Sequence, residues 1–230
     1  MKKWIKRIGL GLLAIVIIAL GGFYVYTLDY SKADAQAQEA FTDSIEQSKT
    51  IHAYLTNESD VGIIFYPGGK VEAKAYSVLG LELSEKGYST FIVDMPFNLA
   101  VFDINAANRV RKLNPQIKTW FIAGHSLGGA MAFSHYDANS DEYAGLILLA
   151  AYPLKATSKP ILILAGSNDK VLDASNLEGF QTTWIQGGNH AQFGNYGLQK
   201  GDGTPTISAS EQRTITIESI SNFILLNLNP

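Results

Sequence analysis

The stretch "TWFIAGHSLGGAMAF", residues 119–133, holds the features from which the rest of the chain can be interpreted. β-forming residues precede Ser126 and small residues follow it, so a strand is predicted to give way to a helix at this serine. Gly124 and Gly128 stand two residues to either side of it. In this G-x-S-x-G spacing the serine occupies a strained turn above a sheet, and small neighbours prevent clashes with the adjoining strand and helix. Ser126 is therefore a candidate nucleophile.

The motif alone carries little weight, so its context matters. From residue 50 onward, β-rich runs alternate with helical patterns, and several runs are continuously apolar, as in strands buried on both faces. This alternation predicts an α/β fold with a mostly parallel central sheet and helices on both faces. The predicted strands are 50–55, 61–66, 89–94, 119–123, 145–151, 161–165 and 182–186, and the predicted helices are 72–86, about 105–113, 127–137 and 208–227.

Polar residues follow the predicted strands at the edge where parallel sheets bind their ligands. Ser126, Asp169 and His190 come after three of these strands, in that order. We expect His190 to act as the general base toward Ser126 and Asp169 to orient its imidazole. Asp173 and Asp202 are alternatives for the acid, and Asp169 is favoured because it lies nearer the end of its strand. The histidines expected to be structural are His52, His125 and His135.

Two backbone N–H groups are candidates for an oxyanion hole. Leu127 follows the serine at the start of a helix, and Gly69 lies in the loop "PGGK" after the strand at 61–66. The candidate substrate-binding residues are Lys70, Phe97, Asn98 and Phe193. The long glycine-rich segment after His190 is a candidate lid. Within it, Phe193 and Tyr196 are expected either to line the pocket or to pack inward and hold His190.

The N-terminal region predicts a membrane anchor. The segment "IGLGLLAIVIIALGGFYVYTL", residues 8–28, holds no charge and is long enough to span a bilayer as a helix. The basic residues ahead of it are Lys2, Lys3, Lys6 and Arg7. By the positive-inside rule the N-terminus stays in the cytoplasm and the remainder lies outside. The alternative is a cleaved signal peptide, since "ADAQA" at 33–37 offers small-x-small sites.

Three regions follow from these patterns. Residues 1–28 are interpreted as the anchor, residues 29–48 as a stalk or linker, and residues 49–230 as the globular domain. Within the stalk, Ala37, Phe41 and Ile45 recur every four residues, which indicates a short amphipathic helix.

Composition excludes several function classes. Of 230 residues, 47% are hydrophobic and 17% are charged, which is typical of a globular chain. The net charge of −3 becomes −7 without the four N-terminal basic residues, so a nucleic-acid partner is not expected. The chain has no cysteine, which excludes disulfides, a thiol nucleophile and thiolate metal sites. No paired-histidine spacing indicates a metal, and "PGGK" lacks the spacing of a phosphate-binding P-loop.

The stretches "FYPGGKVEAKAY", "GHSLGGAMA", "AGSNDKV" and "GGNHAQFGNYG" resemble the α/β-hydrolase superfamily over about residues 61–225. Within it they are similar to the compact branch related to dienelactone hydrolases, and to predicted membrane-anchored hydrolases of that branch. The resemblance implies a Ser-Asp-His site at Ser126, Asp169 and His190, and no cofactor. Dienelactone hydrolases proper use a cysteine nucleophile, which this chain lacks, so their substrate does not carry over.

The expected function is that of a membrane-anchored serine hydrolase acting outside the cytoplasm. Its substrate would be a small-molecule ester of small or medium size, cleaved through an acyl-enzyme. The segment "YPLKATSK" between two predicted strands is too short for the usual crossover helix, so no inserted cap domain is expected. Two alternatives stay open. One is acyl transfer by the same residues, and the other is a catalytically silent binding or envelope-scaffold protein with this fold.

Overall fold

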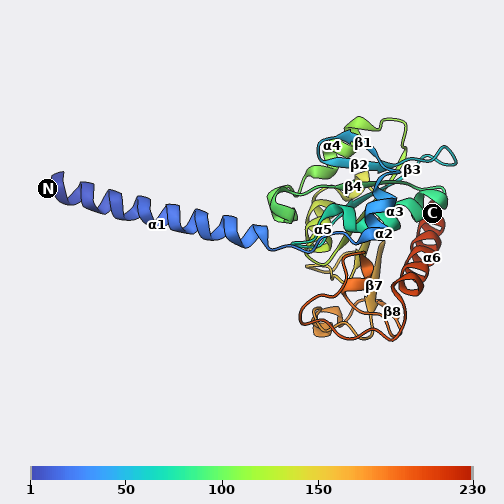
Figure 1. The fold of residues 1–230 in the computed structure, drawn as a ribbon. Coiled ribbons are helices and arrows are strands. Elements are labelled where there is room, and N and C mark those ends of the chain that lie inside the picture. The colour runs from blue at the N-terminus through green and yellow to red at the C-terminus, as the bar shows by residue number, and fades with distance from the viewer. Residues whose placement is uncertain (1, 229–230) are drawn as a thin grey trace. The chain divides into compact units, whose positions relative to one another are not determined.

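The computed structural model describes residues 2–228, and the chain divides into two compact units, residues 1–30 and 31–230 (Figure 1). The first unit consists mainly of helix α1 (Lys2–Leu28). Within α1, the span Lys6–Leu28 has a mean hydropathy of 2.5. The most apolar part of this span is not buried. It is the one helix among the described residues that is long and apolar enough to cross a membrane.

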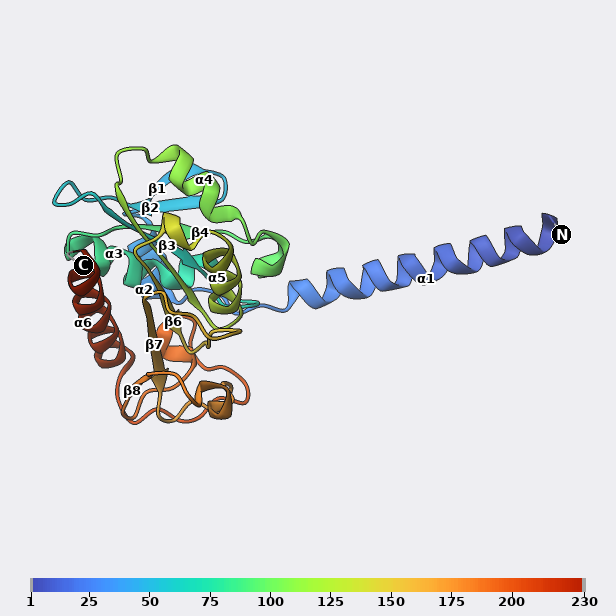
Figure 2. The same ribbon diagram turned by 180° about the vertical axis from the view of Figure 1, so that it is seen from behind.

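The second unit is built on a mixed sheet of eight strands in the order β1-β2-β4-β3-β5-β6-β7-β8. Figures 1 and 2 show β1 and β8 at its opposite ends. Strands β3 to β8 pair in parallel, whereas β2 pairs antiparallel with both β1 and β4. The strands are β1 (Ile45–Ser48), β2 (Ile51–Tyr54), β3 (Val61–Tyr66), β4 (Ser89–Val93), β5 (Thr119–His125), β6 (Gly145–Leu149), β7 (Ile161–Gly166) and β8 (Thr183–Ile185).

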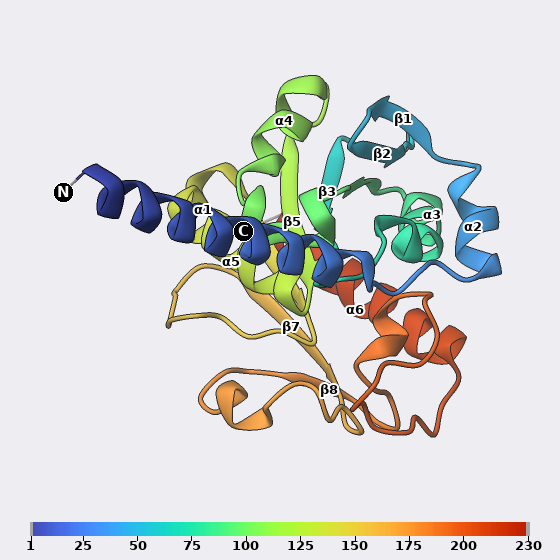
Figure 3. The ribbon, with the colours of Figure 1, turned by 60° about the vertical axis from the view of Figure 1, so that its left-hand side comes forward.

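Helices cover both faces of the sheet, because its strands are apolar on both sides. In β3, Ile63 and Phe65 contribute to one core, while Ile64 and Tyr66 contribute to the other, as the two-residue period of a strand requires. The first core is covered by α2 (Ala35–Phe41), α3 (Ser77–Glu85) and α6 (Ala209–Leu228), and the second by α4 (Ala106–Leu113) and α5 (Leu127–Ala138). Figure 3 shows the two groups on opposite sides of the strands.

Short 3-10 helices lie in the loops that connect these elements. They are η1 (Ala73–Tyr76), η2 (Pro96–Asn98), η3 (Ala100–Phe102), η4 (Ser140–Glu142), η5 (Ala174–Leu177) and η6 (Ala191–Phe193). The loop between β6 and β7 contains no helix, and these two strands are parallel neighbours. The predicted fold class, with a mostly parallel sheet and no inserted cap, is confirmed.

Residues 29–48 differ from the expected stalk. Ala37 and Ala40 of α2 are buried in the first core, and β1 pairs with β2 at the edge of the sheet. The four-residue spacing that indicated one helix ends early, because Ile45 begins β1 opposite Ala53. The second unit therefore begins at Ser31 rather than at residue 49.

Candidate active site

Ser126 occupies a sharp turn between β5 and α5. Its backbone has φ 52° and ψ −123°, a conformation that costs energy for any residue other than glycine. The turn is held on both sides, since the Ser126 N–H donates to the Leu149 carbonyl at 3.0 Å and its carbonyl accepts from the Ala130 N–H at 3.1 Å. A strained serine fixed in this way is the geometry that the G-x-S-x-G spacing predicted.

The two flanking glycines are required by close packing of backbone on backbone. A Cβ at Gly124 would lie 2.6 Å from the carbonyl carbon of Gly128. A Cβ at Gly128 would lie 2.1 Å from the carbonyl oxygen of Pro67. Neither neighbour is a side chain that can rotate away, so α5 reaches this position beside β3 and β5 only when both residues are glycine.

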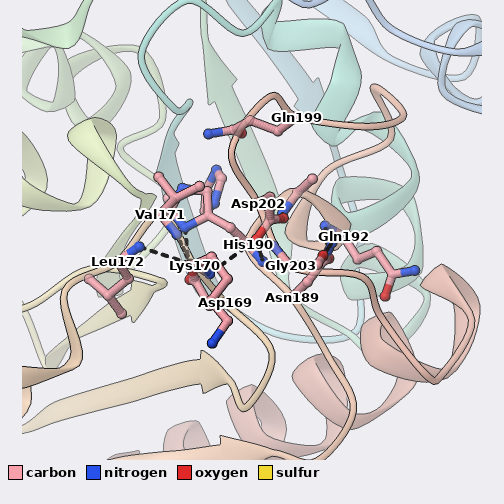
Figure 4. A network of polar contacts seen from close by, with 12 residues as sticks. Asp169, Lys170, Val171, Leu172, Asn189, His190, Gln192, Gln199, Asp202 and Gly203 are labelled. Atoms are coloured by element: carbon pink, nitrogen blue, oxygen red, sulfur yellow. Dashed lines mark hydrogen bonds and ion pairs between the residues drawn. The ribbon is translucent and has the colours of Figure 1, made fainter.

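His190 and Asp169 form a buried pair at the carboxyl ends of β8 and β7 (Figure 4). His190 Nδ1 lies 2.8 Å from Asp169 Oδ2, and both side chains are 2% exposed. The backbone N–H groups of Val171 and Leu172 donate to Asp169 Oδ1, each at 2.8 Å. Burial of Asp169 raises its pKa, but hydrogen bonds from His190 and from the two backbone N–H groups outweigh this, so its pKa lies below the usual value.

An ionised Asp169 determines which nitrogen of His190 carries the proton. A carboxylate only accepts hydrogen bonds, so Nδ1 of a neutral His190 is the donor and Nε2 keeps its lone pair. His190 Nε2 is buried, and no hydrogen-bond partner for it is found among residues 2–228. His190 lines the same pocket as Ser126, so the arrangement presents an unpaired base beside the serine.

The two alternative acids have other partners. Asp202 accepts backbone hydrogen bonds from His190 N–H at 3.3 Å and from Ala191 N–H at 2.9 Å, and so holds the loop that carries the histidine. Asp173 accepts from the Ser175 N–H at 3.0 Å and from the Ser175 hydroxyl at 2.7 Å. Of these three acids, Asp169 is the one whose carboxylate is hydrogen-bonded to the His190 imidazole in the described part of the chain.

The two expected oxyanion donors lie next to each other. Leu127 is the first residue of α5, where the N–H groups of a helix lack internal acceptors and favour negative charge. Gly69 approaches it so closely that a Cβ there would lie 2.8 Å from Leu127 Cδ2. No acceptor for either N–H is found in the described part of the chain. Both groups are therefore available for an anionic oxygen.

A buried tyrosine and histidine support this loop, and neither was expected to bear on the site. The Gly68 N–H donates to the Tyr76 hydroxyl at 3.0 Å, and the hydroxyl in turn lies 2.8 Å from His125 Nδ1. The His125 ring lies 4.6 Å from the His190 ring. Burial, and then the nearby His190, lower the pKa of His125 well below its usual value, and burial raises that of Tyr76. No sequence pattern distinguishes Tyr76 from an ordinary core residue.

A pocket of about 350 Å³ opens beside Ser126. Its lining residues are Ser126, Leu127, Ala130, Ala150, Ala151, Tyr152, Val171, Leu172, Asp173, Asn176 and His190. Apart from the serine and histidine, this wall is mostly apolar, and it comes from the first turn of α5 and from the loops after β6 and β7. Sequence reasoning missed Tyr152, Val171 and Leu172, although each follows a strand at the carboxyl edge of the sheet, where the ligands of parallel sheets bind.

The four expected substrate-binding residues do not line this pocket. Phe193 is buried, and its ring lies 5.8 Å from that of His125; Tyr196 is buried in the same core. Of the two expectations for these aromatic residues, the structure matches inward packing. Lys70 and Asn98 are joined by a backbone hydrogen bond of 2.8 Å, and Phe97 is half exposed in the adjoining turn.

The two remaining histidines have polar partners outside the pocket. His52 Nε2 lies 2.8 Å from Asp94 Oδ2. His135 Nε2 lies 2.8 Å from the Tyr143 hydroxyl. In residues 2–228, no group of three or more His, Asp or Glu side chains is placed to hold a metal ion.

Comparison with known proteins gives a family and several similar folds. The profile of the alpha/beta hydrolase family matches residues 62–214. A predicted CIB-like hydrolase from Thermoplasma acidophilum is 18% identical with a TM-score of 0.56, over 78% of this chain and 96% of that one. A Pyrobaculum calidifontis esterase is 14% identical with a TM-score of 0.57, over 82% and 89%. The monoacylglycerol lipase of Paleococcus ferrophilus is 12% identical with a TM-score of 0.55, over 76% and 100%. No curated protein sequence matches.

Proposed function

The chain belongs to the alpha/beta hydrolase family, and we propose that it is a serine hydrolase that cleaves a small or medium-sized carboxylic ester. The observation that carries this proposal is the unpaired Nε2 of His190, which is buried in the pocket that also holds the strained Ser126. The esterase and the lipase among the similar folds favour an ester over other acyl compounds.

In the proposed first step, Ser126 Oγ attacks the ester carbonyl carbon while its proton passes to His190 Nε2. The carbonyl π electrons move to oxygen, and the N–H groups of Leu127 and Gly69 stabilise the resulting oxyanion. Asp169 stabilises the imidazolium. The carbonyl then re-forms, the alkoxide leaves with the proton from His190, and the acyl group stays on Ser126.

In the second step, water attacks the acyl-enzyme as His190 takes one of its protons. Collapse of this second tetrahedral intermediate breaks the bond to Ser126 Oγ, which regains its proton from His190. The net reaction converts one ester and one water into one acid and one alcohol. The pocket beside Ser126 has a mostly apolar wall, which suits the acyl or alcohol part of such an ester.

We further propose that α1 is an uncleaved anchor and that residues 31–230 lie outside the cytoplasm. The small residues of the alternative cleavage sites support retention, because Ala33 is 5% exposed and Ala37 is fully buried. Asp34 caps α2 by accepting from the Ala37 N–H at 2.8 Å. Cleavage at 33–37 would therefore remove core residues and the cap of a helix. Protease added to intact spheroplasts should digest the domain; protection until lysis would reverse the orientation.

A fluorophosphonate probe on the full-length protein in micelles tests the nucleophile. Wild type should be labelled, and Ser126→Ala should be unlabelled at an unchanged Tm. Ser134→Ala is the matched control, since this serine lies on the same helix with its hydroxyl bonded to the Ala130 carbonyl, and it should label like wild type. Equal labelling of Ser126→Ala and wild type would contradict the assignment. A folded wild type that does not label at all would favour a silent binding protein.

A further inference from the structure

The main chain around His190 is held by side chains. Helix η6 begins directly after this histidine, and the first N–H groups of a helix lack acceptors within it. The N–H groups of residues 189–192 all donate to side-chain oxygens, at distances of 2.9 to 3.3 Å. These oxygens belong to Gln212, to Asp202 and, within the loop itself, to Asn189. The backbone position of His190 therefore depends on side chains that substitution can remove.

Gln212 of α6 bonds both main-chain groups of the residue before the histidine. Its side chain is fully buried, its Oε1 accepts from the Asn189 N–H at 3.0 Å, and its Nε2 donates to the Asn189 carbonyl at 2.8 Å. One side-chain amide thus pairs with the main chain as a neighbouring strand would. Gly188 leaves room for this contact, since a Cβ there would lie 2.6 Å from Gln212 Oε1. The sequence therefore provides both the amide and the space that it needs.

Asp202 connects the loop of the proposed base to the loop of the proposed acid (Figure 4). Its carboxylate accepts from the N–H groups of His190 and Ala191 after β8, and from the Lys170 N–H at 3.4 Å after β7. Lys170 directly follows Asp169, whose own carboxylate is bonded to the imidazole. A single carboxylate therefore joins the main chains that carry the two members of the pair.

We propose that Gln212 and Asp202 are positioning residues, which fix the backbone of residues 189–191 and so keep the His190 imidazole in the pocket that it shares with Ser126. His190 Nε2 has no hydrogen-bond partner among residues 2–228, so the hydrogen bonds that hold this residue are those of Nδ1 and the main chain. Displacement of a catalytic group by about 1 Å can cost about a hundredfold in rate. The catalytic part of this proposal rests on the proposed function.

The two side chains act through the histidine and not on the substrate. Neither Gln212 nor Asp202 lines the pocket beside Ser126. Their loss should therefore leave substrate binding nearly unchanged and slow the steps in which His190 takes or returns a proton. The expected signature is a lower kcat at a constant KM, which general destabilisation of α6 would not produce.

Gln212→Met tests this on the full-length protein in micelles, because methionine has a similar length and lacks both bonds to Asn189. With p-nitrophenyl acetate, kcat should fall about tenfold to a hundredfold and KM should stay within threefold. The matched control is Thr216→Val, one turn later in α6. The buried Thr216 hydroxyl donates to the Gln212 carbonyl at 2.8 Å, a bond that stays within the helix. This control should lower the Tm and keep kcat within twofold; equal losses of kcat in the two variants would overturn the proposal.

Asp202→Asn gives a second test that does not disturb α6. Asparagine keeps the shape and one acceptor oxygen, so the protein should fold, but it lacks the charge and the second oxygen that the loop N–H groups use. We expect kcat to fall about tenfold at a constant KM, since hydrogen bonds to a charged group are the stronger ones. A folded Asp202→Asn protein with the kcat of wild type would overturn the role of Asp202.

Proton NMR tests the positioning without any substrate. A histidine N–H bonded to a carboxylate gives a far-downfield signal, so full-length wild type in micelles should show one that His190→Gln lacks. This signal should shift or broaden in Gln212→Met and Asp202→Asn, and it should stay unchanged in Thr216→Val. An unchanged signal in the first two variants would overturn the positioning, whether or not the protein hydrolyses esters. A changed signal in a protein whose wild type hydrolyses no ester would support the positioning and contradict the proposed function alone.

Discussion

Two histidine–aspartate pairs lie in this domain, and their contacts are nearly the same. His190 Nδ1 lies 2.8 Å from Asp169 Oδ2, and His52 Nε2 lies 2.8 Å from Asp94 Oδ2. In both histidines the other ring nitrogen is buried without a hydrogen-bond partner in the described chain. Distance and burial of the histidine therefore do not separate a candidate catalytic pair from a structural one.

The surroundings of the second nitrogen separate them. His190 lines the pocket that contains Ser126, whereas His52 lies within β2, does not line that pocket and makes an edge-to-face contact with the Phe41 ring. The acids differ as well. Asp169 is 2% exposed and accepts two backbone N–H groups besides the histidine, while the Asp94 side chain is 39% exposed. What distinguishes the candidate pair is a pocket shared with Ser126 and an acid held by two further hydrogen bonds.

The largest expected difference concerns the histidines themselves. His190→Gln should lower kcat/KM for a short ester at least about 10⁴-fold, since it removes the proton acceptor of Ser126. His52→Gln should stay within about threefold of wild type and lower the Tm instead, because a buried group loses its packing. Comparable activity losses in the two variants would show that the pairs are equivalent, and the assignment of His190 would fail.

Substitution of the aspartates should separate the two pairs in the same way, with a somewhat smaller difference in kcat. Asp169→Asn should reduce kcat about 10³–10⁴-fold, because an amide no longer fixes the tautomer that leaves Nε2 free. Asp94→Asn and Asp173→Asn should each change kcat less than threefold. Initial rates on p-nitrophenyl acetate, with circular dichroism as the check of folding, measure all three. A greater loss for Asp173→Asn would mean that the acid is misassigned.

Much of this arrangement could be predicted, because it depends on local periodicity and on order along the chain. Continuous apolar runs placed β3, β5, β6 and β7 to within a few residues, and the strand ends then pointed to Ser126, Asp169 and His190. These three residues do lie together, and their catalytic roles stay predictions. The missing helix between β6 and β7 was also predictable, since its loop is too short.

The parts that could not be predicted depend on how distant loops fold over one another. β1 was hidden because Ile45 continues a helical spacing, and only its pairing with Ala53 makes it a strand. Phe193 has the chemistry of a pocket residue, yet it is buried against His125. Val171 and Leu172 line the pocket because the turn around Asp169 directs them there, and no periodicity records that turn.

A second matched pair of contacts sharpens the comparison at the oxyanion loop. Tyr76 bonds His125 beside the site, and Tyr143 bonds His135 away from it, each at 2.8 Å. Tyr76→Phe leaves the Gly68 N–H and His125 Nδ1 unpaired and should lower kcat about tenfold, with little change in KM, by loosening the loop that carries Gly69. Both variants lose one buried hydrogen bond to a histidine, so both should lower the Tm by a similar amount. Tyr143→Phe should leave kcat unchanged. Equal kcat values in the two variants would assign Tyr76 a purely structural role.

The last prediction concerns stability rather than rate, and it tests whether Asp169 is held as an anion. Its pKa in the folded protein lies below the ordinary value of 3.8, so its charged contacts stabilise the fold fully above that value and cease to do so as the pH falls through the lowered pKa. Asp169→Asn should therefore cost about 1–3 kcal/mol of unfolding free energy at pH 7, the usual worth of hydrogen bonds to a charged group. The difference in unfolding free energy between wild type and Asp169→Asn should disappear as the pH falls below about 4. Urea unfolding in micelles at pH 7, 5 and 3 measures it.

A difference that stays constant, or widens in acid, would mean that Asp169 is already neutral at pH 7. The Nδ1 proton of His190 would then have no anion to hold it, and the contrast with the half-exposed Asp94 would rest on burial alone.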